Sequence, residues 1–333
     1  MESLPVKKIY LDSSHRINTA FTSSSDFTVE LPRNVYFHEY TNCCVSDITI
    51  PFSWRTIDEN VNDKLYVRMS IVTATGGSIV IDAILKLSSN IYDGLALGNE
   101  LINQLKNAYN TSMPPVELAK LPWATNMFLV ASHDDLSNRI TIRWDRAKAL
   151  AQYPANCLQL RIFTDNEMKK MRGPNSISAN KPSVDLSNNM SVFGQDFNKF
   201  DLQSANAIIG NLTRSYNSVI DIEASNKAKS AVYQDMTTGF LNLMRYSHIY
   251  IASEDLSSFN TMGINGECSI LKKVPVTVTF GSIIVDQTYM RTDSTDVTGK
   301  NLRQIRFRLI DSDGKLVNLN GADWSMSLVF SNN

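Results

Sequence analysis

The sequence has few cysteines, almost no net charge and no long apolar run, and each scarcity excludes a class of protein. Four cysteines in 333 residues are too few for a disulfide scaffold, and no two of them have the CxxC spacing of metal or redox sites. The formal net charge of -1 argues against a protein that coats nucleic acid through bulk charge. We also expect no sequence-specific binding of nucleic acid.

Membrane and secretion signals are missing as well. No stretch approaches the roughly 18 apolar residues of a membrane span, so we expect no transmembrane segment. The first residues include Glu2, Lys7, Lys8 and Asp12 instead of the apolar core of a signal peptide. We therefore expect the protein to be synthesised in the cytoplasm and not to be secreted by the standard route.

No known set of catalytic motifs is complete in the sequence. Gly299-Lys300 lacks the glycine that a phosphate-binding loop needs five positions earlier, and none of the four histidines lies in an HExxH motif. Asp313-Gly314 lies between two apolar runs and predicts a hairpin turn rather than a calcium loop. We therefore expect that the protein is not an enzyme and has no catalytic residues, no cofactor and no metal site. An active site that only the fold assembles is the alternative.

Both ends of the chain alternate apolar and polar residues with a period of two, which predicts sheets with one buried face. The pattern covers residues 27–31 near the N-terminus and residues 305–309 and 324–330 near the C-terminus. Neither end has enough strands for a sandwich alone, whereas together they offer about eight. We therefore predict one discontinuous β-sandwich built from residues 1–65 and 245–333.

The middle of the chain, residues 66–244, has a different pattern. Residues 93–109 repeat leucine at helical spacing, and Asp93 suits the N-cap of that helix. A short helix is also predicted over residues 165–171, with Asp165 as its N-cap. A second short helix is predicted over residues 201–212. With strands between the helices, the pattern predicts an inserted α+β domain in a protein that is mainly β.

Two arginines share one face of a predicted strand. Arg306 and Arg308 have the same parity, and Arg303 lies close to them in sequence. A solvated face is one interpretation. The other is an electrostatic contact to a second subunit or to packaged nucleic acid. We treat Arg306 and Arg308 as candidate subunit-interface residues.

A series of short motifs runs in order along nearly the whole chain. They are IYLDSSHR at residues 9–16, SDFTVELP at 25–32, VSDITIP at 45–51, YDG at 92–94, TDNE at 164–167, AIIG at 207–210, IRFRLID at 305–311 and LNGADWS at 319–325. In this order they resemble the penton proteins, the vertex capsid proteins of virophages, polinton-like viruses and related double-jelly-roll viruses.

The resemblance implies a single jelly-roll β-sandwich that carries the α+β domain as an insertion on the outer surface. Five copies would form a homo-pentamer at each fivefold vertex of the virion, surrounded by the double-jelly-roll major capsid protein. It also implies synthesis in the host-cell cytoplasm, and the insertion could bind a host surface receptor. Arg172-Gly173 is followed by Pro174, so an Arg-Gly-Asp receptor motif is not supported.

The expected subunit contacts are the loop of residues 13–25 and strand-face residues such as Arg306 and Arg308. Three alternative functions stay open. The chain could be a receptor-binding, lectin-like spike protein whose insertion binds glycans. It could be another virion component that forms trimers, or an enzyme whose site is invisible in the sequence.

Overall fold

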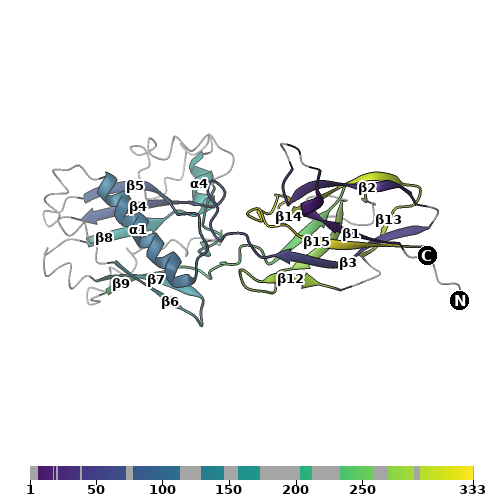
Figure 1. The fold of residues 1–333 in the computed structure, drawn as a ribbon. Helices are drawn as coiled ribbons and strands as arrows, with labels where there is room; N and C mark the ends of the chain where they lie inside the picture. Colours follow the sequence, from purple (N-terminus) through teal and green to yellow (C-terminus); the bar gives the residue numbers. More distant parts are fainter. Residues whose placement is uncertain are drawn as a thin grey trace. The chain divides into compact units, whose positions relative to one another are not determined.

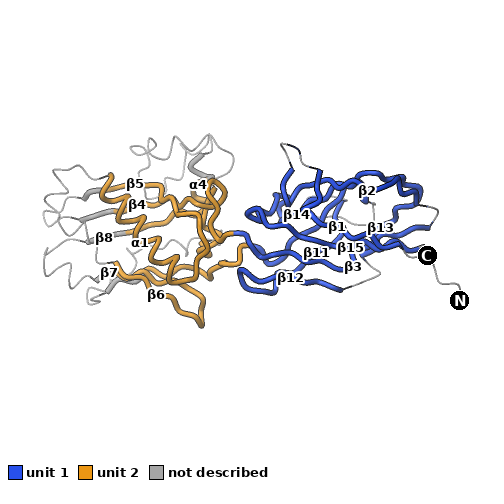
Figure 2. The backbone as a smooth tube through the Cα atoms, in the orientation of Figure 1, with its two compact units in different colours: residues 1–54, 246–333 blue, residues 55–245 orange. Residues whose placement is uncertain are grey.

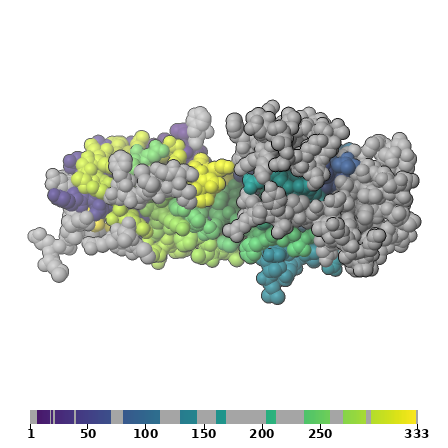
Figure 3. All heavy atoms as spheres, turned by 180° about the vertical axis from the view of Figure 1, so that it is seen from behind, coloured from purple at the N-terminus to yellow at the C-terminus, as the bar shows by residue number. Residues whose placement is uncertain are grey.

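The computed structural model describes residues 7–17, 19, 22–37, 40–72, 78–112, 129–145, 157–172, 203–211, 233–257, 269–288 and 293–332. The chain divides into two compact units (Figure 2). Unit 1 combines Met1–Trp54 with Tyr246–Asn333, and unit 2 is Arg55–Arg245. In Figure 3, purple atoms from the N-terminal part and yellow atoms from the C-terminal part share the surface of unit 1.

Unit 1 is built from antiparallel strands and one turn of 3-10 helix, η1 (Ser13–His15). In chain order its strands are β1 (Lys7–Asp12), β2 (Asp26–Tyr36), β3 (Thr41–Pro51), β10 (His248–Ala252), β11 (Ile270–Pro275), β12 (Ile283–Asp286), β13 (Thr295–Asp296), β14 (Asn301–Ile310) and β15 (Ser325–Asn332) (Figure 1).

The pairing order of these strands is that of a jelly roll. One sheet has the order β1-β15-β3-β12, with the short β13 also paired to β3, and the second sheet has the order β11-β10-β14-β2. The first strand pairs with the last, and the second pairs with the next-to-last, which is the double Greek-key pattern of jelly rolls. The structure therefore confirms the predicted fold class, a mainly β protein with a jelly-roll sandwich.

The core of unit 1 joins the two ends of the chain. Phe27 of β2 and Phe307 of β14 are cross-strand partners whose ring centroids lie 5.8 Å apart. Trp324 meets Phe27 edge to face at 5.6 Å. All three side chains are buried, which confirms the predicted parity of both terminal regions. Burial of these large aromatic rings contributes to the stability of the sandwich together with the aliphatic side chains of the same core.

The register of unit 1 separates the chain termini from the points where the chain leaves for unit 2. Lys7 pairs with Phe330 and Asn332 pairs with Thr41, at the first residue of β3. The chain leaves unit 1 after Pro51, at the last residue of β3. The described termini and the exit to unit 2 therefore lie at opposite ends of the sandwich (Figure 1).

Aromatic stacking marks the place in unit 1 where the chain leaves and returns. Trp54 stacks on Phe52 with centroids 4.2 Å apart and meets Tyr246 at 5.7 Å. The compact units change over directly after Trp54 and directly before Tyr246. We expected the first boundary near residue 65, which lies within the first strand of unit 2. Whether each unit folds as an independent domain stays a prediction.

Unit 2 contains two three-stranded antiparallel sheets and a long helix, α1 (Gly94–Ser112). Its strands are β4 (Lys64–Val72), β5 (Ser78–Lys86) and β8 (Cys157–Ile162) in the order β5-β4-β8, and β6 (Leu129–Asp134), β7 (Arg139–Asp145) and β9 (Tyr233–Thr237) in the order β6-β7-β9. Helix α1 packs against β5, β6 and β7. The predicted N-cap is confirmed, because Asp93 Oδ1 accepts a 2.7 Å hydrogen bond from the N–H of Ala96.

Two local expectations for unit 2 were wrong. Helix α4 (Asp165–Arg172) is capped by Thr164 instead of Asp165: Thr164 Oγ1 accepts from the N–H of Glu167, and Glu167 Oε2 accepts from the N–H of Thr164. Residues 203–211 form turns instead of a helix. The buried Asn206 holds this segment by donating to the carbonyl of Phe163 (2.9 Å), a bond that helical periodicity does not predict.

Candidate assembly surfaces

The outer face of the four-stranded sheet contains the arginines that the sequence singled out. Arg306 on β14 makes a two-pronged ion pair with Asp26 on β2, with Nε 2.7 Å from Oδ1 and Nη2 2.6 Å from Oδ2. The backbone N–H of Arg306 also donates to Asp255 Oδ2 at 2.7 Å. The hydrogen bond and the charge of Asp26 raise the pKa of Arg306 above its ordinary value. Arg306 is therefore engaged within its own subunit.

Arg308 has a different environment although it lies two residues further along the same strand. It is half-buried, and its cross-strand neighbours are Asp26 and Ala252. The carboxylate of Asp26 is occupied by Arg306, and Arg308 has no ion pair with any residue that the structure describes. The structure thus places both candidates on one outer face but gives them unequal freedom to contact another molecule.

The segment that supports Arg306 is held by a lysine. Lys300 Nζ donates to the carbonyls of Asp255 (2.7 Å) and Ser257 (2.9 Å). Burial lowers the pKa of Lys300, and the carboxylate of Asp255 opposes that effect. The bonds fix the loop after β10 against the start of β14. These bonds position Asp255, which belongs to no sequence motif, so that its carboxylate reaches the backbone N–H of Arg306.

The described residues of the serine-rich segment 13–25 are bound to the β14–β15 connection. Ser13 Oγ donates to Asp323 Oδ1 (2.8 Å), and Arg16 Nη1 reaches the same oxygen at 2.7 Å. The indole Nε1 of Trp324 donates to the carbonyl of Ser24 (2.7 Å), and the hydroxyl of Ser25 donates to the carbonyl of Val317. Much of the polar character that suggested a subunit contact is therefore used inside the fold.

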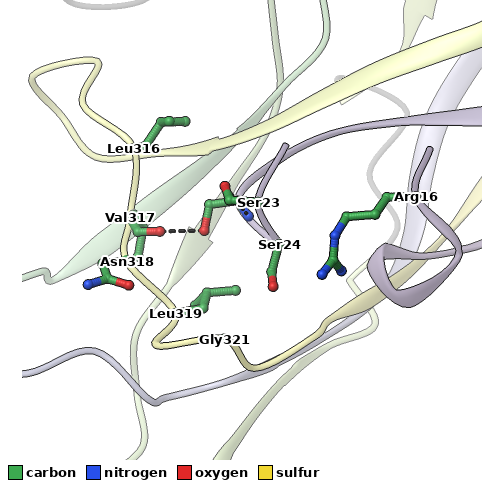
Figure 4. Close-up of a pocket in the computed structure, with 9 residues that line it drawn as sticks. Arg16, Ser23, Ser24, Leu316, Val317, Asn318, Leu319 and Gly321 are labelled. Carbon is green, nitrogen blue, oxygen red and sulfur yellow. Dashed lines mark hydrogen bonds between the residues drawn. The ribbon is translucent and has the colours of Figure 1, made fainter. Parts of the chain in front are cut away.

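A cavity of about 320 Å³ lies beside these bonds (Figure 4). Its lining comes from the loop after β1 and from the β14–β15 connection: Arg16, Ser23, Ser24, Ser25, Leu316, Val317, Asn318, Leu319 and Gly321. Ser53 Oγ donates to the carbonyl of Leu319, which places this connection beside the end of β3 where the chain leaves for unit 2. The cavity therefore lies at the same end of unit 1 as the exit to unit 2.

The outer face of the five-stranded sheet has a polar half and an apolar edge. On the polar half, Asp47 accepts from Lys8 Nζ (2.9 Å) and from Ser327 Oγ (2.7 Å), so three neighbouring strands are linked across the face. At the β12 edge, Ile283 and Val285 are 56% and 59% exposed. Motif searches missed this edge because the exposed side chains of β12 are aliphatic and belong to no known motif.

Several other features of the described residues bear on function. No group of three or more His, Cys, Asp or Glu side chains among them could hold a metal ion. None of their helices is both long and apolar enough to cross a membrane. Cys43 and Cys44 are buried free thiols, and burial raises the pKa of Cys43.

This chain is similar to a solved viral protein. The selenomethionine-labelled mavirus penton protein matches 98% of this chain and 100% of its own, with a TM-score of 0.46 and 12% sequence identity. This is a resemblance of fold at most. No family model matches the chain, and no curated protein does. That this chain is a virophage penton, and most like the mavirus type, stays a proposal.

Proposed function

We propose that this chain is a structural capsid protein, a penton whose pentamers close the fivefold vertices of an icosahedral particle. The observation that carries the proposal is the jelly-roll strand order with unit 2 inserted between β3 and β10. Jelly rolls serve as capsid, lectin and cupin domains, so the fold alone does not choose among them. The ordered motifs that resemble pentons favour the capsid role over the other two.

The polarity of unit 1 supports an orientation at the vertex. Its described termini lie at one end of the sandwich, and the chain leaves for unit 2 at the other end. A shell subunit of this kind can direct unit 2 outward and its termini inward. In this orientation unit 2 projects from the outer surface of the particle, where a host receptor would contact it. The double-jelly-roll major capsid protein surrounds unit 1. An inward-facing unit 2 in a vertex density map would contradict the orientation.

A closed fivefold ring needs two different surfaces on each subunit, because the contact is head to tail. We assign one of these surfaces to the outer face of the four-stranded sheet. Arg308 is the cation on this face that would meet an acidic neighbour. Arg306 instead links β14 to β2 through its ion pair with Asp26. A non-enzymatic role in the virion, without a cofactor, follows from the same proposal.

The decisive experiment measures the mass of the purified chain by light scattering at two salt concentrations, with electron micrographs of the same fractions. We expect particles of five times the chain mass of 37.3 kDa and fivefold rosettes. Trimers would favour a spike protein instead. If the chain is monomeric, it is mixed with the major capsid protein. Failure to bind would overturn the vertex role and leave the lectin-like function, which a glycan array tests.

A further inference from the structure

The four outermost strands of unit 1 differ in how they are protected against further pairing. Edge strands expose unpaired backbone groups, and natural sheets protect them with lysine, arginine, proline or other charges. Three of these edges follow the rule, with exposed Lys7 and Lys8 on β1, Pro32 and Arg33 on β2, and Lys273 and Pro275 on β11. The fourth edge, β12, has the sequence Ile-Ile-Val-Asp.

The one charged residue of β12 does not protect the edge. Asp286 points into the sandwich, where its carboxylate lies 3.3 Å from the ammonium group of Lys272 on β11. The side chains of Lys272 and Asp286 are only 3% and 10% exposed. Ile284 is buried at 2%, so the solvent face of the strand presents only Ile283 and Val285.

The same two residues present their backbone groups to the free edge. The N–H of Phe52 donates to the carbonyl of Ser282, which makes 282 and 52 a hydrogen-bonded pair. Hydrogen-bonded pairs alternate along an antiparallel ladder, so Ile284 bonds Ile50, while Ile283 and Val285 direct their N–H and C=O away from β3. Pro51, which has no N–H, is the cross-strand partner of Ile283, as this assignment requires. No other strand of the described chain pairs with this side of β12 (Figure 1).

We propose that the β12 edge binds an extended segment of another polypeptide, which adds a strand to the five-stranded sheet. The N–H and C=O groups of Ile283 and Val285 would supply the backbone hydrogen bonds. The exposed side chains of these two residues select apolar residues at alternate positions of the incoming segment.

The geometry favours a different protein over a second copy of this chain as the source of the segment. Pairing of β12 with β12 would be two-fold, and a fivefold ring requires two different surfaces. Pairing with β1 of a second copy would bring Lys7 and Lys8 to an edge with no exposed acidic side chain. This step rests on the proposed vertex role, which makes the surrounding major capsid protein the neighbour to test.

The probes are overlapping synthetic peptides that cover the major capsid protein encoded with this chain. We expect one peptide with alternating apolar residues to bind the full-length chain and to slow hydrogen exchange at the amides of Ile283 and Val285. Val285→Pro removes an outward N–H without touching the ladder to β3, and Ile283→Lys protects the edge with a charge. Each variant should weaken binding by about tenfold or more.

Tyr10→Lys, on the β1 edge of the same sheet, is the matched control and should bind like the parent, because Tyr10 is also well exposed (76%). Binding that survives in both Val285→Pro and Ile283→Lys, or the absence of any peptide that protects the two amides, would overturn the proposal. Light scattering on the same samples reports the ring separately. Rings with unprotected amides contradict only the edge docking, whereas a parent chain that forms no rings alone and does not bind the major capsid protein contradicts the vertex role.

Discussion

Unit 1 and unit 2 close their cores in different ways. In unit 1, both sheets combine strands from the two ends of the chain, so that β1 pairs with β15 and β2 pairs with β14. Unit 2 is one continuous stretch of chain, in which α1 covers strands that flank it in sequence. We therefore expect unit 1 to form only when both ends of the chain are present, and unit 2 to form from its own segment. The predictions below test this difference.

The largest effect is expected at the aromatic centre of unit 1. Trp324→Ala removes a ring that is only 2% exposed and also the hydrogen bond to Ser24, at the point where the two ends of the chain meet. We expect a loss of about 3–5 kcal/mol from the free energy of unfolding of unit 1. Urea unfolding followed by circular dichroism should show this transition moving while that of unit 2 stays. Trp324→Phe is the milder control, and equal movement of both transitions would show that the units unfold together.

A smaller effect is expected at the ion pair between the two sheets of unit 1. Burial raises the pKa of Asp286, but hydrogen bonds from Thr288 and the nearby Lys272 more than offset this, so the pKa is lowered overall. A lowered carboxyl pKa stabilises the fold above the ordinary pKa, and this contribution disappears as the pH falls through the folded-state value. Asp286→Asn should cost about 2–3 kcal/mol near neutral pH.

The same substitution should also make the stability of unit 1 less sensitive to acid below about pH 4, where an aspartate ordinarily titrates. Unfolding curves collected from pH 7 to pH 3 provide the measurement. Asp313→Asn, at an exposed turn, is the matched control. An acid profile identical to that of the parent would show that Asp286 does not link the two sheets.

In unit 2, the corresponding test concerns the contact of α1 with the sheet. Glycine inside a helix costs about 1 kcal/mol relative to alanine, so Gly98 needs a packing reason. A Cβ atom at this position would lie 2.8 Å from Ala131 Cβ and 3.1 Å from Ile140 Cγ2. Gly98→Val should therefore cost unit 2 about 2 kcal/mol by overpacking. The urea transition of unit 1 should not change, and a shift of that transition would contradict the division into two units.

Local patterns in the sequence predicted much of the fold, and long-range geometry supplied the rest. Alternation predicted the strands around Phe27 and Phe307, and helical spacing predicted α1 with its Asp93 cap. No local pattern predicts that β2 pairs with β14. The turns around Asn206 were mistaken for a helix because their stability comes from a bond to the distant Phe163.

The candidate site shows the same limit. Parity placed Arg306 and Arg308 on one face, as the structure does. From the sequence alone, Arg306 and Arg308 were equally good candidates for the subunit interface. The sequence does not show that Asp26 lies within reach of Arg306. The register between β2 and β14 creates that ion pair, and it leaves Arg308 as the cation that can face outward.

The smallest effect on folding should come from these two arginines. The Arg306 and Asp26 side chains are 51% and 15% exposed, and ion pairs near the surface contribute little, so Arg306→Gln should cost about 0.5–1 kcal/mol. Arg308→Glu removes no described ion pair but puts a second carboxylate opposite Asp26, so it should cost up to about 1 kcal/mol. If Arg308 meets an acidic neighbour, Arg308→Glu should nevertheless weaken pentamers strongly, and more at low salt than at high salt. Arg303→Glu reverses a more exposed cation on the same strand, with the loss of its ion pair with Glu30, and is the control for charge reversal. Pentamers of Arg308→Glu with parental stability at both salt concentrations would remove this arginine from the subunit interface, and the outer face of the four-stranded sheet would then be a solvated surface.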